Sequence, residues 1–134
     1  MNKLNAKIFE IHTEGQLSLV KAAINDVLIC AIIIDTPETA CYLTIGNNVQ
    51  ILFKETEVVI AKEFTGSISI QNRLNCIIQS IEKGKILSKI NMCLFDYAVS
   101  SLITTQALLQ LHLVVGDEVI AMIKTNEVNL SAYD

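Results

Sequence analysis

Asn2-Lys3-Leu4-Asn5 near the start of the chain recurs 70 residues later as Asn72-Arg73-Leu74-Asn75. Further identities at the same offset are Leu17 with Leu87, Gly46 with Gly116, Lys54 with Lys124, and Glu57 with Glu127. An ungapped register that keeps glycine, lysine and glutamate in step indicates an internal duplication. The sequence therefore predicts two units, residues 1–64 and residues 65–134.

The size of these units predicts that they do not stand alone. The 134 residues are 51% hydrophobic and 18% charged, which excludes a disordered chain. Each unit has only about 60 residues, a length at which an isolated core is marginal. We therefore expect the units to pack on each other or on further copies, giving a homo-oligomer, either a dimer or a trimer.

Charge and composition exclude several functional classes. A net charge of −4 and an aromatic content of 5% without tryptophan argue against binding to nucleic acid or to an anionic membrane. Apolar runs fall short of the roughly 20 residues that span a bilayer, and no secretory signal is visible, so a cytoplasmic location is expected. The four cysteines and two histidines lack zinc-site spacing, which predicts cysteines in the core and no metal.

Apolar and β-branched residues predict strands in the second unit, over residues 74–81, 86–94, 97–104, 119–124 and 128–130. Turns are expected near Lys83-Gly84 and at Asp96. Thr104 and Thr105 precede residues 106–111, where hydroxyl side chains are able to cap a short helix. In the first unit, Thr36-Pro37 predicts a corresponding helix over residues 38–43.

Five strands and one short helix per unit predict an all-β fold of two tandem OB-like five-stranded barrels. Closure into a barrel removes exposed sheet edges. An open β-sandwich is the alternative.

The second unit also resembles a known family. The residues that carry the resemblance are Asn72–Cys76, Ser80–Gly84, Ile103–Thr105, Leu111–Val119 and Ile123–Val128. Together they resemble the Mop (TOBE) family of molybdate-binding domains. The first unit matches more weakly, and the two units together resemble a di-Mop protein.

This resemblance implies OB-like barrels that assemble with copies of themselves and bind molybdate or tungstate where units meet. Because the chain has no helix-turn-helix segment and no P-loop, a stand-alone cytoplasmic store or buffer of the oxyanion fits best. No further cofactor is expected. Neither paired carboxylates nor a nucleophile with a nearby base is evident, so the protein is not expected to be an enzyme.

Molybdate is a tetrahedral dianion whose oxygens only accept hydrogen bonds, so its site needs N–H and O–H donors and positive charge. The family pattern, carried over to the second unit, implies as ligands Ser69, Gln71, Arg73, Thr104, Thr105, Lys124 and Thr125. Gln71 stands where family members carry arginine, and Ala107 replaces a serine, so one fixed charge is absent. Arg73 lies on the same side as Gln71 if the strand is regular.

The first unit has a poorer set of donors, and its site is expected to be degenerate. Lys54 is retained, and Thr36 is able to donate from the helix cap. Asp35 and Glu55 stand where donors would help, and their carboxylates would repel a dianion.

Each of these residues also has a purely structural interpretation. Lys124 is equally explained as a solvated strand-end charge, Thr104 and Thr105 as helix caps, and Ser69 as a plain serine of an exposed strand. An alternative function therefore stays open, a self-associating interaction or regulatory module that has lost its anion site.

Overall fold

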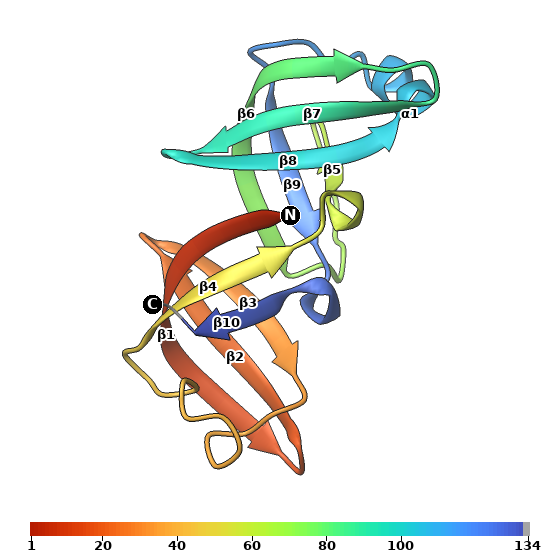
Figure 1. The fold of residues 1–134 in the computed structure, drawn as a ribbon. Coiled ribbons are helices and arrows are strands. Elements are labelled where there is room, and N and C mark those ends of the chain that lie inside the picture. The colour runs from red at the N-terminus through yellow and green to blue at the C-terminus, as the bar shows by residue number, and fades with distance from the viewer. Residues whose placement is uncertain (133–134) are drawn as a thin grey trace.

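The computed structural model describes residues 1–132 as two curled five-stranded sheets, one above the other (Figure 1). The first half contributes β1 (Asn2–Glu14), β2 (Leu17–Ile24), β3 (Val27–Ile33), β4 (Asn48–Phe53), the 3₁₀ turn η1 (Glu55–Glu57) and β5 (Val59–Ala61). The second half contributes β6 (Asn72–Lys83), β7 (Leu87–Leu94), β8 (Tyr97–Thr104), α1 (Thr105–Gln110), β9 (Glu118–Ile123), η2 (Thr125–Glu127) and β10 (Asn129–Ala132). The predicted all-β fold of two OB-like barrels is confirmed.

Every strand pair in both sheets is antiparallel, and the burial pattern follows the pleat. Side chains of β1 alternate between buried and exposed from Asn2 to Lys7, and those of β6 do so from Asn72 to Ile77. Such alternation is the pattern of strands that turn one face to a core and the other to solvent. A register shift interrupts the ladder between Ile8 and Glu10, and again 70 residues later between Ile78 and Ser80. The duplication read from the sequence is therefore repeated in the backbone.

The two halves exchange their last strands. The first sheet has the order β10-β4-β1-β2-β3, and the second has the order β5-β9-β6-β7-β8. β10 pairs with β4 through Leu130 and Ile51, while β5 pairs with β9 through Ile60 and Ala121. Each barrel therefore combines residues of both sequence units. The predicted unit boundaries, residues 1–64 and 65–134, describe the sequence repeat and remain a prediction. Residues 133 and 134 lie outside the described residues.

One apolar core runs through both barrels. A single buried cluster includes Leu4 and Phe53 from the first half together with Ile90 and Met92 from the second. Because this core is shared, the exchanged halves bury their apolar faces on each other, as expected of units too small to stand alone. In the described part of the chain, no helix has the length and apolar character needed to cross a bilayer.

The prediction of a helix over residues 38–43 is wrong, because the structure has only turns there. Thr39 Oγ1 accepts a hydrogen bond from the Thr36 N–H at 2.8 Å and donates to the Asp35 carboxylate at 3.1 Å. A threonine side chain that bonds to the local backbone offers it an alternative to helical hydrogen bonds. In α1, Ala107, Leu108 and Leu109 stand where the first half has Pro37, Glu38 and Thr39, and leucine is a better helix former than threonine.

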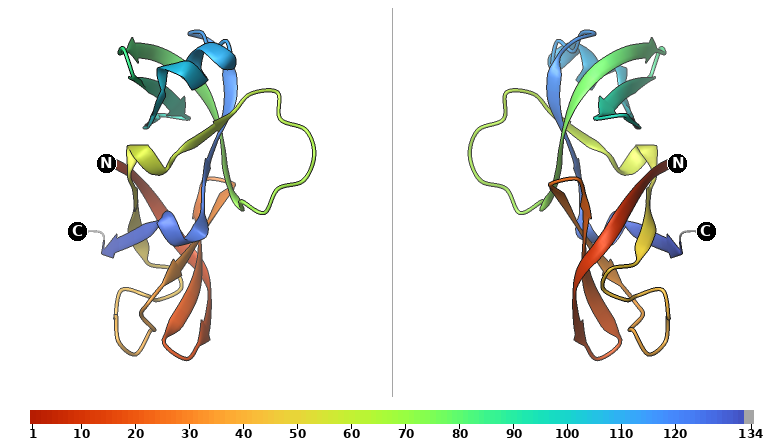
Figure 2. Two further views of the ribbon diagram at one scale, coloured as in Figure 1. Left: turned by 90° about the vertical axis from the view of Figure 1, so that its right-hand side faces the viewer. Right: turned by 90° about the vertical axis from the view of Figure 1, so that its left-hand side faces the viewer.

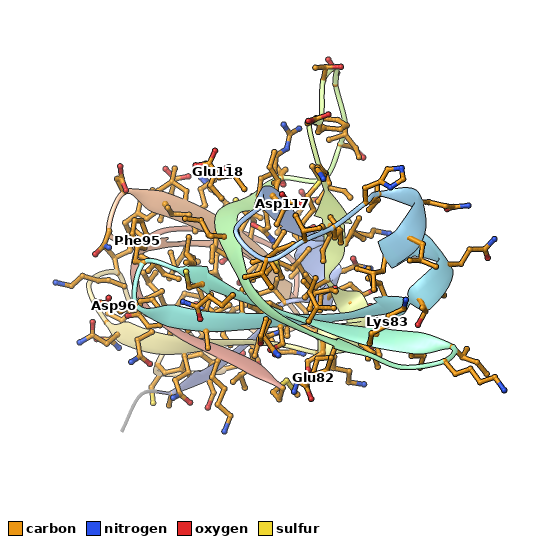
Figure 3. All side chains as sticks on the ribbon, turned by 90° about the horizontal axis from the view of Figure 1, so that it is seen from above. Glu82, Lys83, Phe95, Asp96, Asp117 and Glu118 are labelled. Atoms are coloured by element: carbon orange, nitrogen blue, oxygen red, sulfur yellow. The ribbon has the colours of Figure 1, made fainter. Side chains whose placement is uncertain are left out.

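The turns of the second barrel lie where the sequence predicts them. Figure 3 shows Lys83 and the Phe95-Asp96 turn at opposite ends of the barrel. Phe95 adopts a φ of 54°, a left-handed conformation that asparagine tolerates better than phenylalanine does, and the corresponding residue of the first half is Asn25.

Ser69 does not lie in a strand. Residues 62–71 form a loop between β5 and β6 that stands clear of both sheets (Figure 2). The period-2 pattern of residues 67–70 has no neighbouring strand to pair with, so the expectation of an exposed strand is wrong.

Candidate functional site

The strand exchange places Lys54 and Lys124 at the junctions between the two halves. Lys54 follows β4 and Lys124 follows β9, and both have an extended backbone. Their carbonyl groups accept hydrogen bonds from the N–H groups of Glu57 and Glu127, each at 3.0 Å, which closes the turns η1 and η2. η1 packs against β8 of the second half, and η2 packs against β3 of the first.

The junction at Lys54 encloses a hollow of about 390 Å³, which we call the Lys54 hollow. It is lined by Met1, Lys54, Glu55, Thr56, Lys89 and Leu102. Glu55 makes its ion pairs here: Lys89 Nζ lies 3.4 Å from Glu55 Oε2, and the Met1 amino group lies 3.4 Å from Glu55 Oε1. The Glu55 carboxylate is therefore held between Lys89 and the Met1 amino group, while Lys54 forms no ion pair with residues 1–132.

The Lys124 junction consists of the positions 70 residues away, namely Gln71, Lys124, Thr125, Asn126, Leu19 and Ile32. Asn72 pairs with Ile123, so Gln71 and Lys124 are neighbours at the ends of β6 and β9. Leu19 and Ile32 pair across β2 and β3, the sheet edge on which η2 packs. The structure therefore brings together three of the predicted ligands, Gln71, Lys124 and Thr125.

Lys124 is exposed, and it forms no ion pair with any residue from 1 to 132. Gln71, Thr125 and Asn126 add neutral side chains that carry N–H and O–H donors. A positive charge with neutral donors and no paired carboxylate is chemistry that suits an oxyanion.

Arg73 is directed to the loop rather than to the Lys124 junction. Its guanidinium donates to the carbonyl oxygens of Ile70 at 3.1 Å and Ile68 at 3.0 Å, and lies 5.9 Å from the centre of the Phe64 ring. These contacts give Arg73 a structural role in shaping the loop that carries Ser69. Ser69 and Gln71 are both exposed near the base of this loop.

The three remaining threonines make contacts within the fold. Thr104 Oγ1 accepts a hydrogen bond from the Ala107 N–H at 3.1 Å, so Thr104 caps α1. Thr105 is buried, and its hydroxyl donates to the Gly84 carbonyl at 2.8 Å. The Thr36 hydroxyl lies 3.4 Å from that of Thr39. Thr104 at the start of α1 and Lys124 at the start of η2 lie at opposite ends of the second barrel (Figures 1 and 2), so one chain does not bring Thr104 to Lys124.

An ion pair holds the start of the loop between β5 and β6 to the second barrel. Lys62 Nζ lies 3.0 Å from Asp117 Oδ2 and donates to the His112 carbonyl at 2.8 Å. Asp117 also accepts a hydrogen bond from the Val114 N–H at 3.0 Å. This backbone hydrogen bond, together with Lys62, holds the pKa of Asp117 below its ordinary value.

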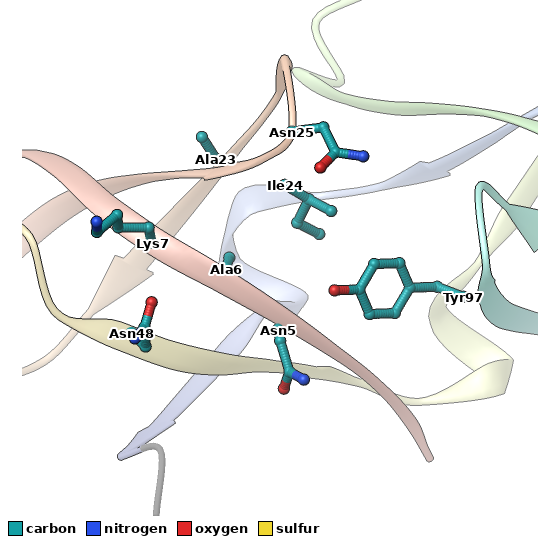
Figure 4. A pocket seen from close by; sticks show the side chains of 8 residues that line it. All are labelled: Asn5, Ala6, Lys7, Ala23, Ile24, Asn25, Asn48 and Tyr97. Atoms are coloured by element: carbon teal, nitrogen blue, oxygen red, sulfur yellow. The ribbon is translucent and has the colours of Figure 1, made fainter.

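A polar pocket of about 300 Å³ lies where the second half meets the first barrel. Figure 4 shows the Tyr97 ring pointing from β8 toward the first barrel, between Ile24 and Asn5. Lys7 and Asn48 lie on the far side of the pocket. Sequence reasoning missed this pocket, and Lys89 of the Lys54 hollow as well. No motif marks these residues, and the contacts depend on how the halves pack.

Comparisons with known proteins agree with this architecture. Residues 68–130 match the profile of the TOBE domain family. A comparison with curated proteins finds no match. A molybdate-bound crystal structure of ModG, described as a cytoplasmic molybdate-binding protein, matches with a TM-score of 0.92. The match covers 98% of this chain and 96% of the ModG chain at 20% sequence identity.

A molybdate-binding protein from Sporomusa ovata is 34% identical over 44% of this chain and 88% of its own, with a TM-score of 0.43. The match to ModG shows that the two chains share a fold. The exchange of strands between the two β-barrels of this chain could not be predicted from its sequence patterns. The profile match over residues 68–130 shows that the second half of the chain is similar to the TOBE domain family.

Proposed function

We propose that this protein binds molybdate or tungstate where its units meet and thereby stores or buffers the oxyanion in the cytoplasm. The observation that carries the proposal is the Lys124 junction, where an ammonium group that forms no ion pair with residues 1–132 lies beside Gln71 and Thr125. The match of residues 68–130 to the TOBE domain family supports it. The shared fold with ModG, a protein described as a cytoplasmic molybdate-binding protein, is consistent with it.

The chemistry of the junction accounts for binding without covalent change. The Lys124 ammonium compensates part of the double negative charge, and the side chains of Gln71, Thr125 and Asn126 donate hydrogen bonds to the oxygens. Hydrogen bonds to charged groups each contribute about 1.5–3 kcal/mol, so Lys124 alone accounts for tenfold or more in affinity.

Thr104 joins this site only across an interface between copies of the chain. It lies at the α1 end of the second barrel, whereas Lys124 follows β9 at the other end of that barrel (Figure 2). Ser69 is exposed near the base of the loop, two residues before Gln71. The proposal therefore includes a homo-oligomer, in which the donors of one chain complete the junction of another.

Isothermal titration calorimetry with molybdate, tungstate and sulfate tests the proposal. Wild-type protein is expected to bind molybdate and tungstate, and Lys124→Met is expected to lose at least tenfold in affinity. Lys85→Met is the matched control, because Lys85 is an exposed lysine of the β6–β7 turn, away from both junctions. Absence of heat from wild-type protein at micromolar oxyanion contradicts the proposal.

The second candidate is a self-associating interaction or regulatory module without an anion site. It is favoured by Glu55, whose carboxylate is paired with Lys89 and the Met1 amino group in the Lys54 hollow. This candidate predicts that Lys124→Met and wild-type protein behave alike with every oxyanion, whereas the first predicts that they differ.

A further inference from the structure

The Lys54 hollow and the Lys124 junction are built on the same backbone but differ in their charged side chains. Glu55 corresponds to Thr125, and Lys89 corresponds to Leu19. One site therefore carries two lysines, the Met1 amino group and a carboxylate, while the other carries a single lysine and a hydroxyl group.

Glu55 occupies the position that an anion would take beside Lys89. Its side chain is 29% exposed and its Oε2 lies 3.4 Å from Lys89 Nζ, on the wall of the hollow that also carries Lys54. A carboxylate oxygen and an oxyanion oxygen are both acceptors for an ammonium group, so Glu55 already occupies part of the donor capacity of Lys89. A dianion entering the hollow is repelled by the negative charge of Glu55, which also compensates part of the positive charge of Lys89.

We propose that Glu55 is an internal counter-ion that closes the Lys54 hollow to doubly charged oxyanions, so that only the Lys124 junction takes them. This inference rests on the proposed function, because it holds that Glu55 determines which of the two related sites binds the oxyanion. Thr125 has the same place in η2 as Glu55 has in η1, and it supplies a donor without a charge.

Exchange of these two residues tests the inference. In Glu55→Thr, the hollow keeps Lys54 and Lys89 and loses the carboxylate that pairs with Lys89, so the number of molybdate ions bound per chain is expected to double. Adding Lys54→Met to that variant is expected to return the number to the wild-type value. In Thr125→Glu, the affinity at the Lys124 junction is expected to fall about tenfold or more, because a carboxylate then stands beside the single lysine.

Glu57→Thr is the matched control, since it removes a carboxylate from the same 3₁₀ turn while leaving the Lys89–Glu55 pair in place. Calorimetric titration with sodium molybdate at low ionic strength gives the number of sites, and thermal unfolding shows that each variant is folded. The control is expected to match wild-type protein.

The possible outcomes separate this inference from the proposed function. If wild-type protein binds molybdate and Glu55→Thr binds the same number with the same affinity, the inference is overturned and the proposed function stands. If wild-type protein binds nothing and Glu55→Thr binds one ion per hollow, the role of Glu55 stands and the Lys124 site is overturned. If neither protein binds molybdate, both are overturned.

Discussion

Asn72 is joined to the main chain of Cys30 by two hydrogen bonds that link the two halves. Its Nδ2 donates to the Cys30 carbonyl at 2.8 Å, and its Oδ1 accepts from the Cys30 N–H at 2.7 Å. The same pair of bonds recurs 70 residues away, where Asn2 contacts the main chain of Ser100 at 2.8 and 2.7 Å. Each half therefore holds an edge strand of the other through a buried asparagine side chain.

We predict that Asn72→Leu destabilises the protein by about 1–3 kcal/mol, because it leaves the N–H and carbonyl of Cys30 without their partners. Urea unfolding measures the change. Asn75→Leu is the control, because Asn75 is exposed on the same strand. If the two variants unfold at the same urea concentration, the contact between Asn72 and Cys30 has no role in joining the halves.

Removal of residues 129–134 is predicted to weaken the first barrel rather than the second. β10 pairs with β4, so its loss exposes the backbone of β4 to solvent. Hydrogen exchange measured by mass spectrometry is expected to show faster exchange in β4 than in β9. The opposite result, with faster exchange confined to the second barrel, contradicts the exchange of strands.

Local patterns predicted most of the fold, and packing between the halves decided the rest. Alternation in residues 74–81 and the turn at Asp96 were readable because each depends on neighbours in sequence. The exchange of β5 and β10 could not be predicted, because both strands have the same apolar pattern whichever sheet they join. A short helix likewise depends on small differences in propensity, and in the first half the Thr39 side chain bonds to the Thr36 N–H within turns instead.

The candidate site was predictable only in part, for the same reason. Lys124 and Gln71 meet because their strands pair, which the repeat and the strand pattern indicate. Lys89 meets Glu55 only because η1 packs on the other barrel. The predicted roles of Thr104 and Thr105 in binding remain untested, although both hydroxyl groups have partners within the fold.

Asp117→Asn is predicted to lower the Tm at neutral pH and to have less effect in acid. The pKa of Asp117 is lowered by the Val114 N–H and by Lys62, so its carboxylate stabilises the folded state above the unfolded pKa of about 3.9. This contribution is lost as the pH falls through the lower pKa of the folded state. Thermal unfolding from pH 7 to pH 3 checks the trend.

Asp96→Asn is the control for that series, because Asp96 is exposed in the β7–β8 turn and makes no ion pair among residues 1–132. A Tm difference between wild-type protein and Asp117→Asn that stays constant down to pH 3 is incompatible with the ion pair to Lys62.

Alkylation is predicted to distinguish the cysteines. Burial raises the pKa of the Cys76 thiol to about 12, with Cys93 as a smaller cause, so almost no thiolate is present at pH 8. Cys41 is exposed in the turns that follow β3. Iodoacetamide followed by peptide mass spectrometry is expected to show modified Cys41 and unmodified Cys76 in the folded protein. Equal rates for the two thiols contradict the burial of Cys76.

Crystals grown with sodium molybdate give the most direct test of the account. Anomalous diffraction at the molybdenum edge locates the metal without reference to the protein. The account predicts a strong peak within hydrogen-bonding reach of Lys124 and Thr125, and none in the Lys54 hollow. A peak beside Lys54 and Lys89, or no peak at either junction, contradicts it.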